Sequence, residues 1–225
     1  MWSPDGRRIV FASNHHGVYD LFEKSDGTSA EKPLLVDAAE KLPLSWSRDG
    51  HYLLYRTTGS NGHSELWALS MVGEQKRFPV VRTNFDEDEG QISPDSNWVA
   101  YGSTESGRHE IYLDSFPSGR DRIRISTDGG AQVRWAPNGR ELYYITPDGH
   151  LMAVTVARGD STPSLKVGAP QTLFQTRLAT GANVNVKPQY AVASDGRFLM
   201  NIRIDDPRPA PITIVLNGLE ALTRR

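Results

Sequence analysis

The sequence predicts an all-β repeat protein, and three observations support this prediction. One short polar phrase recurs along the chain, and its Asp or Asn falls at positions 5, 49, 95, 138 and 195, with spacings of 44, 46, 43 and 57 residues. A period in the forties is typical of proteins that repeat one supersecondary unit. Each copy is followed by a short apolar and aromatic run, and a helical period of apolar residues is not sustained except at 219–222.

The repeated phrase has the composition of a tight turn. It reads Trp-Ser-Pro-Asp-Gly at residues 2–6, and related copies stand at 46–50, 92–96, 135–139 and 193–196. Proline presets its own φ, Asp or Asn bonds the backbone just downstream, and Gly tolerates positive φ. We therefore expect a hairpin turn in each copy, formed by Asp5, Asp49, Asp95, Asn138 and Asp195.

Strand patterns follow each turn in a fixed order. The first run after the turn lies at 8–11, 52–55, 98–101, 141–144 and 197–200. A second lies at 19–22, 64–67, 109–112 and 149–152, and a third at 32–36, 76–80, 122–125 and 171–174. With the strand that enters the turn, each unit has about four antiparallel strands, which is typical of a β-propeller blade. The predicted repeats are 1–40, 41–84, 85–128, 129–180 and 181–217, with a tail at 218–225.

Composition narrows the classes of function. The chain has 225 residues, a net charge of −2 and no cysteine. The charge gives no basic field for nucleic acid or an acidic membrane, and the lack of cysteine excludes disulfides and thiolate metal sites. We find no apolar run of about 20 residues for a membrane span and no signal-peptide pattern. A protein or peptide is the expected partner.

The repeated phrase resembles the TolB-like propeller repeat, which the propellers of prolyl-oligopeptidase and tricorn peptidases share. A longer ordered series resembles the C-terminal propeller of bacterial, acidobacterial-type serine/threonine protein kinases. The residues that carry it lie at 88–95, 98–101, 105–112, 116–117, 126–130, 139–144, 148–154 and 211–217. The sequence departs from that pattern at Ser96, in place of a turn glycine, and at Gly218, in place of an aromatic residue.

The kinase resemblance implies a non-catalytic sensor or interaction module, because the kinase motifs themselves are absent from the sequence. It also implies the extracytoplasmic side of a bacterial membrane if the parent is membrane-anchored, and the cytoplasm otherwise. Two alternatives stay open: the gating propeller of a prolyl-oligopeptidase-type peptidase, and a free-standing periplasmic TolB-like adaptor. No residue is predicted to be catalytic.

The sequence leaves two interpretations of the extent of the propeller. The sequence starts inside a turn phrase, which favours an incomplete arc of a larger propeller over a closed ring of five blades. In the ring, a C-terminal strand at 211–216 would complete the first blade. An arc would leave sheet edges open, so we expect self-association through them.

Four consecutive acids, Asp86, Glu87, Asp88 and Glu89, form the strongest local anomaly. We expect them in a loop that leads into the inner strand of the third blade, near one mouth of the central channel. A solvated acidic loop is the favoured interpretation; Ca²⁺ bound through carboxylate oxygens, or a basic partner, are the alternatives. No other cofactor or metal is expected.

Other recurring side chains are expected to be structural. Asp20, Glu65 and Glu110 recur once per unit, as hydrogen-bond acceptors for nearby turns do. His15, His16, His63 and His109 are expected to be exposed in turns. The aromatic residues that recur at the repeat period are expected in the core between blades, with their polar groups paired: Trp2, Phe11, Trp46, Tyr55, Tyr101, Trp135 and Tyr144.

Overall fold

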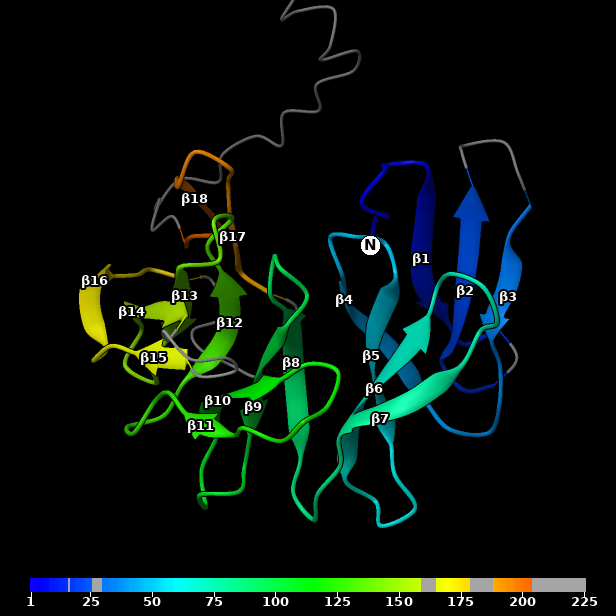
Figure 1. Cartoon of the computed structure of the whole chain (residues 1–225), viewed down its shortest axis with the longest axis horizontal. Coiled ribbons are helices and arrows are strands. Elements are labelled where there is room, and N and C mark those ends of the chain that lie inside the picture. Colours follow the sequence, from blue (N-terminus) through cyan, green and yellow to red (C-terminus); the bar gives the residue numbers. More distant parts are fainter. Residues whose placement is uncertain (16, 26–29, 159–164, 179–187, 204–225) are drawn as a thin grey trace, which may run out of the picture.

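The computed structural model describes residues 1–15, 17–25, 30–158, 165–178 and 188–203. This part of the chain contains eighteen strands and no helix (Figure 1). The expected strand at 211–216, the helical period at 219–222, Gly218 and His16 lie outside the described residues.

The strands form successive antiparallel sheets along the chain. The first sheet has three strands: β1 (Arg8–Ser13), β2 (Asp20–Ser25) and β3 (Lys32–Leu35). The second has four: β4 (Lys41–Trp46), β5 (Tyr52–Thr58), β6 (Ser64–Ser70) and β7 (Arg77–Val81). The third also has four: β8 (Glu87–Ile92), β9 (Trp98–Ser103), β10 (Glu110–Ser115) and β11 (Ile123–Arg124).

The last two sheets depart from the four-stranded pattern. The fourth comprises β12 (Ala131–Trp135), β13 (Glu141–Ile145), β14 (His150–Arg158), β15 (Leu165–Val167) and β16 (Gln171–Gln175). Its long strand β14 pairs with β15 along one part and with β16 along another. The described part of the fifth sheet is the hairpin of β17 (Tyr190–Val192) and β18 (Phe198–Met200).

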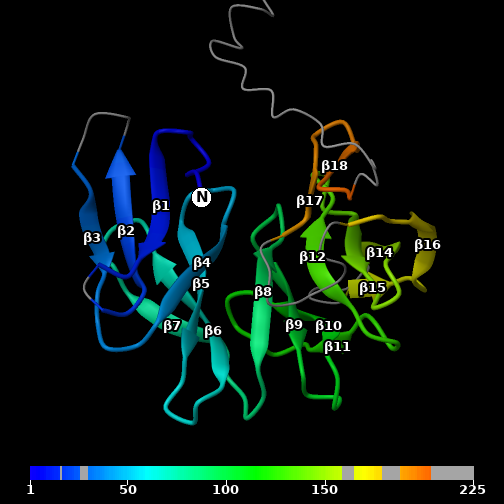
Figure 2. The same cartoon turned by 180° about the vertical axis from the view of Figure 1, so that it is seen from behind.

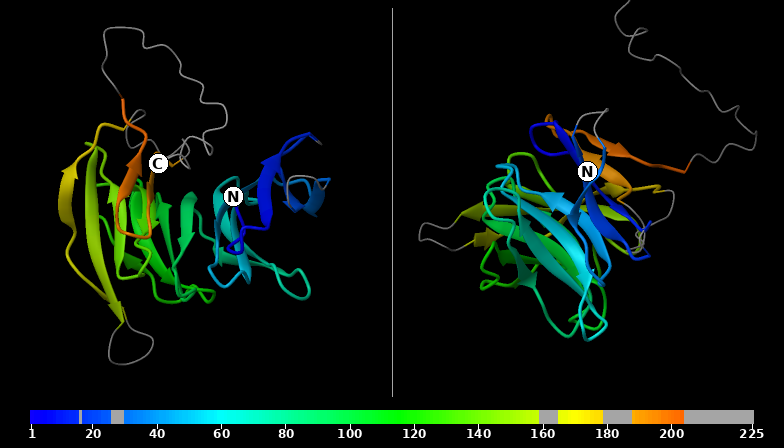
Figure 3. Two further views of the ribbon diagram at one scale, coloured as in Figure 1. Left: turned by 90° about the horizontal axis from the view of Figure 1, so that it is seen from above. Right: turned by 90° about the vertical axis from the view of Figure 1, so that its right-hand side faces the viewer.

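The sheets follow one another in chain order along an open arc (Figures 1 and 2). The first strands of successive sheets contact one another, and β4 and β8 are directly joined where the backbone N–H of Ile92 donates to Ser45 Oγ at 3.1 Å. Seen from above, the first and last sheets stand at the two ends of this arc (Figure 3). This arrangement confirms the predicted all-β fold and is that of a partial propeller.

In the first three copies of the turn phrase, the serine two residues before the Asp makes the same two local hydrogen bonds. Ala136 and Ala193 replace this serine in the fourth and fifth copies, where a backbone N–H just downstream still donates to Oδ1 of Asn138 or Asp195. In the second copy, Ser47 Oγ donates to Asp49 Oδ1 at 2.6 Å and accepts from the backbone N–H of Tyr52 at 2.8 Å. The residue after Asp49 is Gly50, with φ of 79°. Ser96 takes the same left-handed conformation, with φ of 58°. The turn therefore keeps its backbone conformation although serine replaces the usual glycine.

The core lies between neighbouring sheets, and most of the recurring aromatic residues belong to it. Tyr55, Tyr101 and Tyr144 are at most 3% exposed. The prediction for Trp2 is wrong, because this side chain is 62% exposed. Trp2 pairs with the edge of the first sheet, which has a neighbouring sheet on one side only within the described residues.

Candidate functional site at the inner edge of the sheets

The acidic segment does not form the expected loop. Asp86 precedes β8, but Glu87, Asp88 and Glu89 are part of that strand: Glu87 and Asp88 pair with β9, and Glu89 lies at the register shift that follows. Alternation of side chains along a strand sends neighbours in different directions. The four carboxylates therefore have four separate environments.

The two aspartates of this segment make ordinary polar contacts. Exposed Asp86 accepts a hydrogen bond from the backbone N–H of Ser64 at 3.0 Å, and this bond is the main cause of its lowered pKa. Asp88 forms an ion pair with Arg56 on β5, with 3.0 Å between Oδ2 and Nη1. These contacts tie the start of β8 to the second sheet.

Glu87 is entirely buried and only partly bonded. One of its carboxylate oxygens accepts from the hydroxyl of Thr83, while Oε2 has no hydrogen-bond partner in the part of the chain that the structure describes. Burial raises the pKa of Glu87 to about 7, against the weaker opposing effects of Thr83 and Arg122.

Glu89 and Gln132 occupy the same position, six residues before Asp95 and Asn138 respectively, on the inner strands of adjacent sheets. Both have left-handed backbones, with φ of 57° and 58°, and both lie where the strand register shifts. Such a bulge turns the backbone out of the ladder and re-aims the side chain. The backbone N–H of Gln132 donates to Glu89 Oε2 at 2.5 Å.

The same connection repeats between the fourth and fifth sheets. The backbone N–H of Gln189, again six residues before its turn Asp195, donates to Gln132 Oε1 at 2.8 Å. Asn201 in turn donates from Nδ2 to Gln189 Oε1 at 2.8 Å. A row of side-chain acceptors therefore links the inner edges of three successive sheets.

Two further side chains complete what we call the inner-edge cluster: Glu89, Gln132, Arg134, Gln189 and Tyr190. The guanidinium of Arg134 lies over the Tyr190 ring, 5.9 Å from its centroid, within cation–π range. Burial lowers the pKa of Arg134, and burial also raises the pKa of Glu89 to about 7, although the bond from Gln132 and the charge of Arg134 oppose this rise.

Two buried polar atoms of the inner-edge cluster, Gln132 Nε2 and Tyr190 Oη, have no hydrogen-bond partner among the described residues. The side chains of Gln132 and Tyr190 are 1% and 4% exposed. Among the recurring aromatic residues, whose polar groups were expected to be paired, the expectation is wrong for Tyr101, because its buried Oη also lacks a partner among the described residues. An unpaired buried polar group costs free energy, and a bound ligand that pairs with it recovers that cost.

Metal binding gains no geometric support among the described residues. They contain no group of three or more His, Asp or Glu side chains that could hold an ion. In the acidic segment, the candidate for Ca²⁺, each of the four carboxylates accepts a hydrogen bond from a different residue: Ser64, Thr83, Arg56 or Gln132. In the same part of the chain, no helix is long and apolar enough to cross a membrane.

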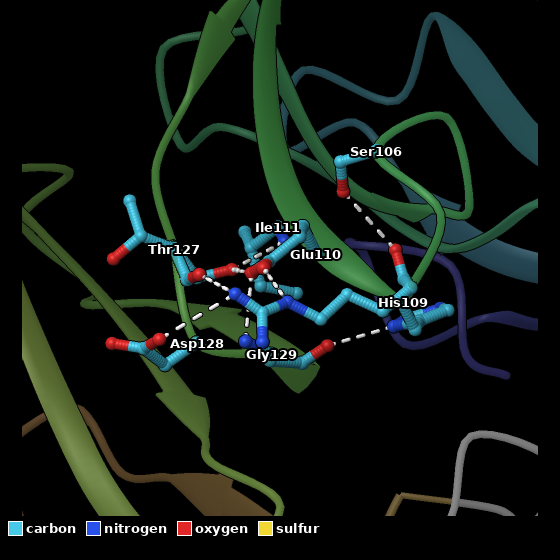
Figure 4. Close-up of polar contacts among 10 residues, drawn as sticks. Ser106, His109, Glu110, Ile111, Thr127, Asp128 and Gly129 are labelled. Carbon is cyan, nitrogen blue, oxygen red and sulfur yellow. Dashed lines mark hydrogen bonds and ion pairs between the residues drawn. The ribbon is translucent and has the colours of Figure 1, made fainter.

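The acids that recur once per unit all make structural contacts, and the predicted hydrogen bond from a nearby turn or loop is present for Asp20 and Glu110 but is not the contact made by Glu65. Asp20 accepts from the backbone N–H of Asp37 at 3.2 Å, and Glu65 from the indole N–H of Trp67 at 2.8 Å. Glu110 is fully buried and accepts from Arg108 Nε at 2.7 Å and from the backbone N–H of Gly129 at 3.0 Å (Figure 4).

The histidines differ in their environments. His109 is partly buried, and its Nδ1 lies 2.7 Å from the carbonyl oxygen of Gly130, whereas exposure in a turn was expected (Figure 4). His63 is partly exposed and lies 3.4 Å from Asp86. His15 is exposed and contacts the hydroxyl of Ser13 at 2.7 Å.

Sequence reasoning identified Glu89 but missed Gln132, Arg134, Gln189 and Tyr190. A signal was present: when the repeats are aligned on their turn Asp or Asn, the position six residues earlier holds Glu89, Gln132 and Gln189. Pro43 holds that position in the second unit and offers no acceptor side chain. The recurrence of side-chain acceptors in consecutive units is what could have identified the row.

No family profile and no curated protein matches the sequence. Among solved structures, TolB from Agrobacterium tumefaciens is similar with a TM-score of 0.61 and 17% identity, over 78% of this chain and 64% of that chain. TolB from Acinetobacter baumannii has a TM-score of 0.54 and 16% identity, over 88% of this chain and 51% of that one. A puromycin-hydrolyzing peptidase from Mycobacterium tuberculosis has a TM-score of 0.58 and 14% identity, over 85% of this chain and 34% of that one.

These similarities establish the fold. The chain has a TolB-like β-propeller fold, and its described sheets form a partial arc of such a propeller. It spans less than two thirds of the length of each of these three structures.

Proposed function

We propose that this chain is a non-catalytic propeller module that binds a protein or peptide partner at the inner-edge cluster. The observation that carries the proposal is the pair of buried, unpartnered polar groups, Gln132 Nε2 and Tyr190 Oη. An extended peptide presents carbonyl oxygens at regular intervals, which suit both of these donors.

The charges of the inner-edge cluster suit the same kind of partner. Beside the unpartnered amide and hydroxyl, Arg134 presents a basic group, and Glu89 presents an acidic group that its pKa of about 7 leaves only partly ionised at neutral pH. A rigid scaffold with a few convergent polar groups is the usual design of a recognition site. The proposed role in a bacterial serine/threonine kinase rests on the sequence resemblance alone.

Tyr190→Phe should weaken partner binding without loss of stability. The change removes a hydroxyl that makes no hydrogen bond with the described residues, so the free energy of unfolding should stay the same or rise by about 1 kcal/mol. Binding should weaken about tenfold, by the loss of one hydrogen bond in a desolvated site. A peptide selected from a random phage-displayed library on the wild-type chain serves as the probe, with affinity measured by calorimetry.

Tyr101→Phe is the matched control. Tyr101 is also fully buried with an unpartnered hydroxyl, but it packs in the core between the second and third sheets, away from the inner-edge cluster. It should reproduce the stability effect and leave binding unchanged. Failure to select any peptide, or equal loss of binding in both variants, would contradict the proposal.

The peptidase alternative keeps one supporting observation, the similarity to the M. tuberculosis enzyme. In that case the propeller would gate access to a hydrolase domain of the same polypeptide. The codons that flank this segment in its gene distinguish the candidates: an in-frame kinase domain supports the sensor module, and an in-frame hydrolase domain supports the gate.

A further inference from the structure

We infer that a cavity at the hairpin-turn end of the third and fourth sheets binds the carboxylate of a small apolar organic acid. The cavity has a volume of about 900 Å³, within the range of roughly 300–1,000 Å³ that small-molecule sites occupy. It is lined by residues distinct from the inner-edge cluster, so the inference is independent of the proposed function.

The wall of this cavity is largely aromatic and aliphatic. Trp98 and Trp135 contribute from adjacent sheets, and Val156 and Leu165 add apolar surface. The indole N–H of Trp135 donates to the carbonyl oxygen of Gln91 at 3.0 Å, whereas that of Trp98 has no hydrogen-bond partner in the described part of the chain. The wall therefore offers apolar contact together with one unused donor.

The rim of the cavity is basic, although the whole chain is slightly acidic. Arg48, Arg140 and Arg158 lie around it with a single carboxylate, Asp95. Burial opposes ionisation of Asp95, but hydrogen bonds from Ser93 and Arg158 outweigh it and lower its pKa to about 2. Asp95 is thus ionised at neutral pH and is neutralised by Arg158, at 2.5 Å.

The other two arginines retain donors for a ligand. Arg48 makes one hydrogen bond, at 3.3 Å, to the carbonyl oxygen of Pro137, and a guanidinium has five N–H donors. The guanidinium of Arg140 has no hydrogen bond or ion pair with any described residue. Two under-used guanidinium groups beside an apolar wall favour a ligand that carries a carboxylate on an apolar body.

Calorimetry with 3-phenylpropanoate and its uncharged amide, 3-phenylpropanamide, tests this inference on the whole chain. The acid should bind about tenfold more tightly than the amide. In the double variant Arg48→Gln/Arg140→Gln, the acid should weaken to the level of the amide while the amide is unaffected. Added salt should weaken binding of the acid to the wild-type chain.

The chain provides a matched control variant, Arg7→Gln. Arg7 follows the turn glycine of the first copy just as Arg140 follows that of the fourth, is exposed like it, and lies outside the cavity. It should bind the acid as the wild type does, and all variants should keep the wild-type melting temperature. No binding of the acid, equal affinity for acid and amide, or an equal effect of Arg7→Gln would overturn the inference.

Discussion

Replacing Lys41 by Met should lower the free energy of unfolding by about 3–5 kcal/mol. Lys41 lies on β4 and is 1% exposed. Its Nζ lies 2.8 Å from Asp20 Oδ1 on β2 and 2.7 Å from Asp37 Oδ1. Without the ammonium group, the charge of Asp20 stays buried with no countercharge, and this is the main source of the expected loss. Urea unfolding followed by tryptophan fluorescence measures it.

The effect should be concentrated in the first sheet. In a repeat protein, stability is approximately the sum of each unit and its interfaces with neighbours, and Lys41 bridges the first and second units. Hydrogen exchange of the amides in β1–β3 should therefore accelerate more than exchange in β8–β11.

Two further variants isolate the cause. Lys41→Met/Asp20→Asn removes both charges and should recover part of the loss, since Asp37 is 32% exposed and can be hydrated. Lys76→Met removes an exposed partner of Glu74 and should change stability by less than about 0.5 kcal/mol. A loss below about 1 kcal/mol for Lys41→Met would show that the buried pair contributes little.

The hairpin turns could be predicted from sequence because every bond that defines them is local. In the third copy, Ser93 Oγ donates to Asp95 Oδ1 at 2.6 Å and accepts from the backbone N–H of Trp98 at 3.0 Å, all within six residues. The strands that flank these turns follow from their apolar and aromatic composition. The all-β fold and the repeat therefore follow from information within each unit.

The inner-edge cluster could not be predicted in the same way, because its geometry depends on contacts between units. Glu89 and Gln132 adopt left-handed backbones that such residues rarely take. The bond from Gln132 to Glu89 links residues 43 positions apart. The local pattern therefore predicted a loop at 86–89, and it indicated neither the strand that begins at Glu87 nor the bulge at Glu89.

Buried charge is a second feature that the sequence does not reveal. Lys41 stands in a segment that resembles an ordinary amphipathic strand, and its burial depends on Asp20, 21 residues earlier in the chain. The acidic run at 86–89 misleads in the opposite direction. Four consecutive acids predict one exposed acidic surface, but Glu87 is buried and only its neighbour Asp86 is exposed.

Glu87→Gln should raise the free energy of unfolding by about 2 kcal/mol at pH 8 and leave it nearly unchanged at pH 5. Burial raises the pKa of Glu87 from 4.5 to about 7. Between these values the folded state binds a proton that the unfolded state releases, so the stability of the wild type falls as pH rises through this window. Above pH 7 the folded state contains a buried carboxylate with an unpartnered oxygen, and the glutamine removes that charge. Urea unfolding at the two pH values measures the change.

Glu110→Gln is the matched control, and at pH 8 it should lower the free energy of unfolding where Glu87→Gln raises it. Both glutamates are 0% exposed, but the carboxylate of Glu110 accepts hydrogen bonds from Arg108, Ser126 and Gly129. In Glu110→Gln, an amide NH₂ group replaces one acceptor oxygen and points at these donors. This change should lower the free energy of unfolding by about 2–3 kcal/mol. Burial depth alone would predict the same sign for both substitutions. Opposite signs would show that unmet hydrogen bonding decides the effect, whereas equal destabilisation by Glu87→Gln at pH 5 and pH 8 would contradict this account.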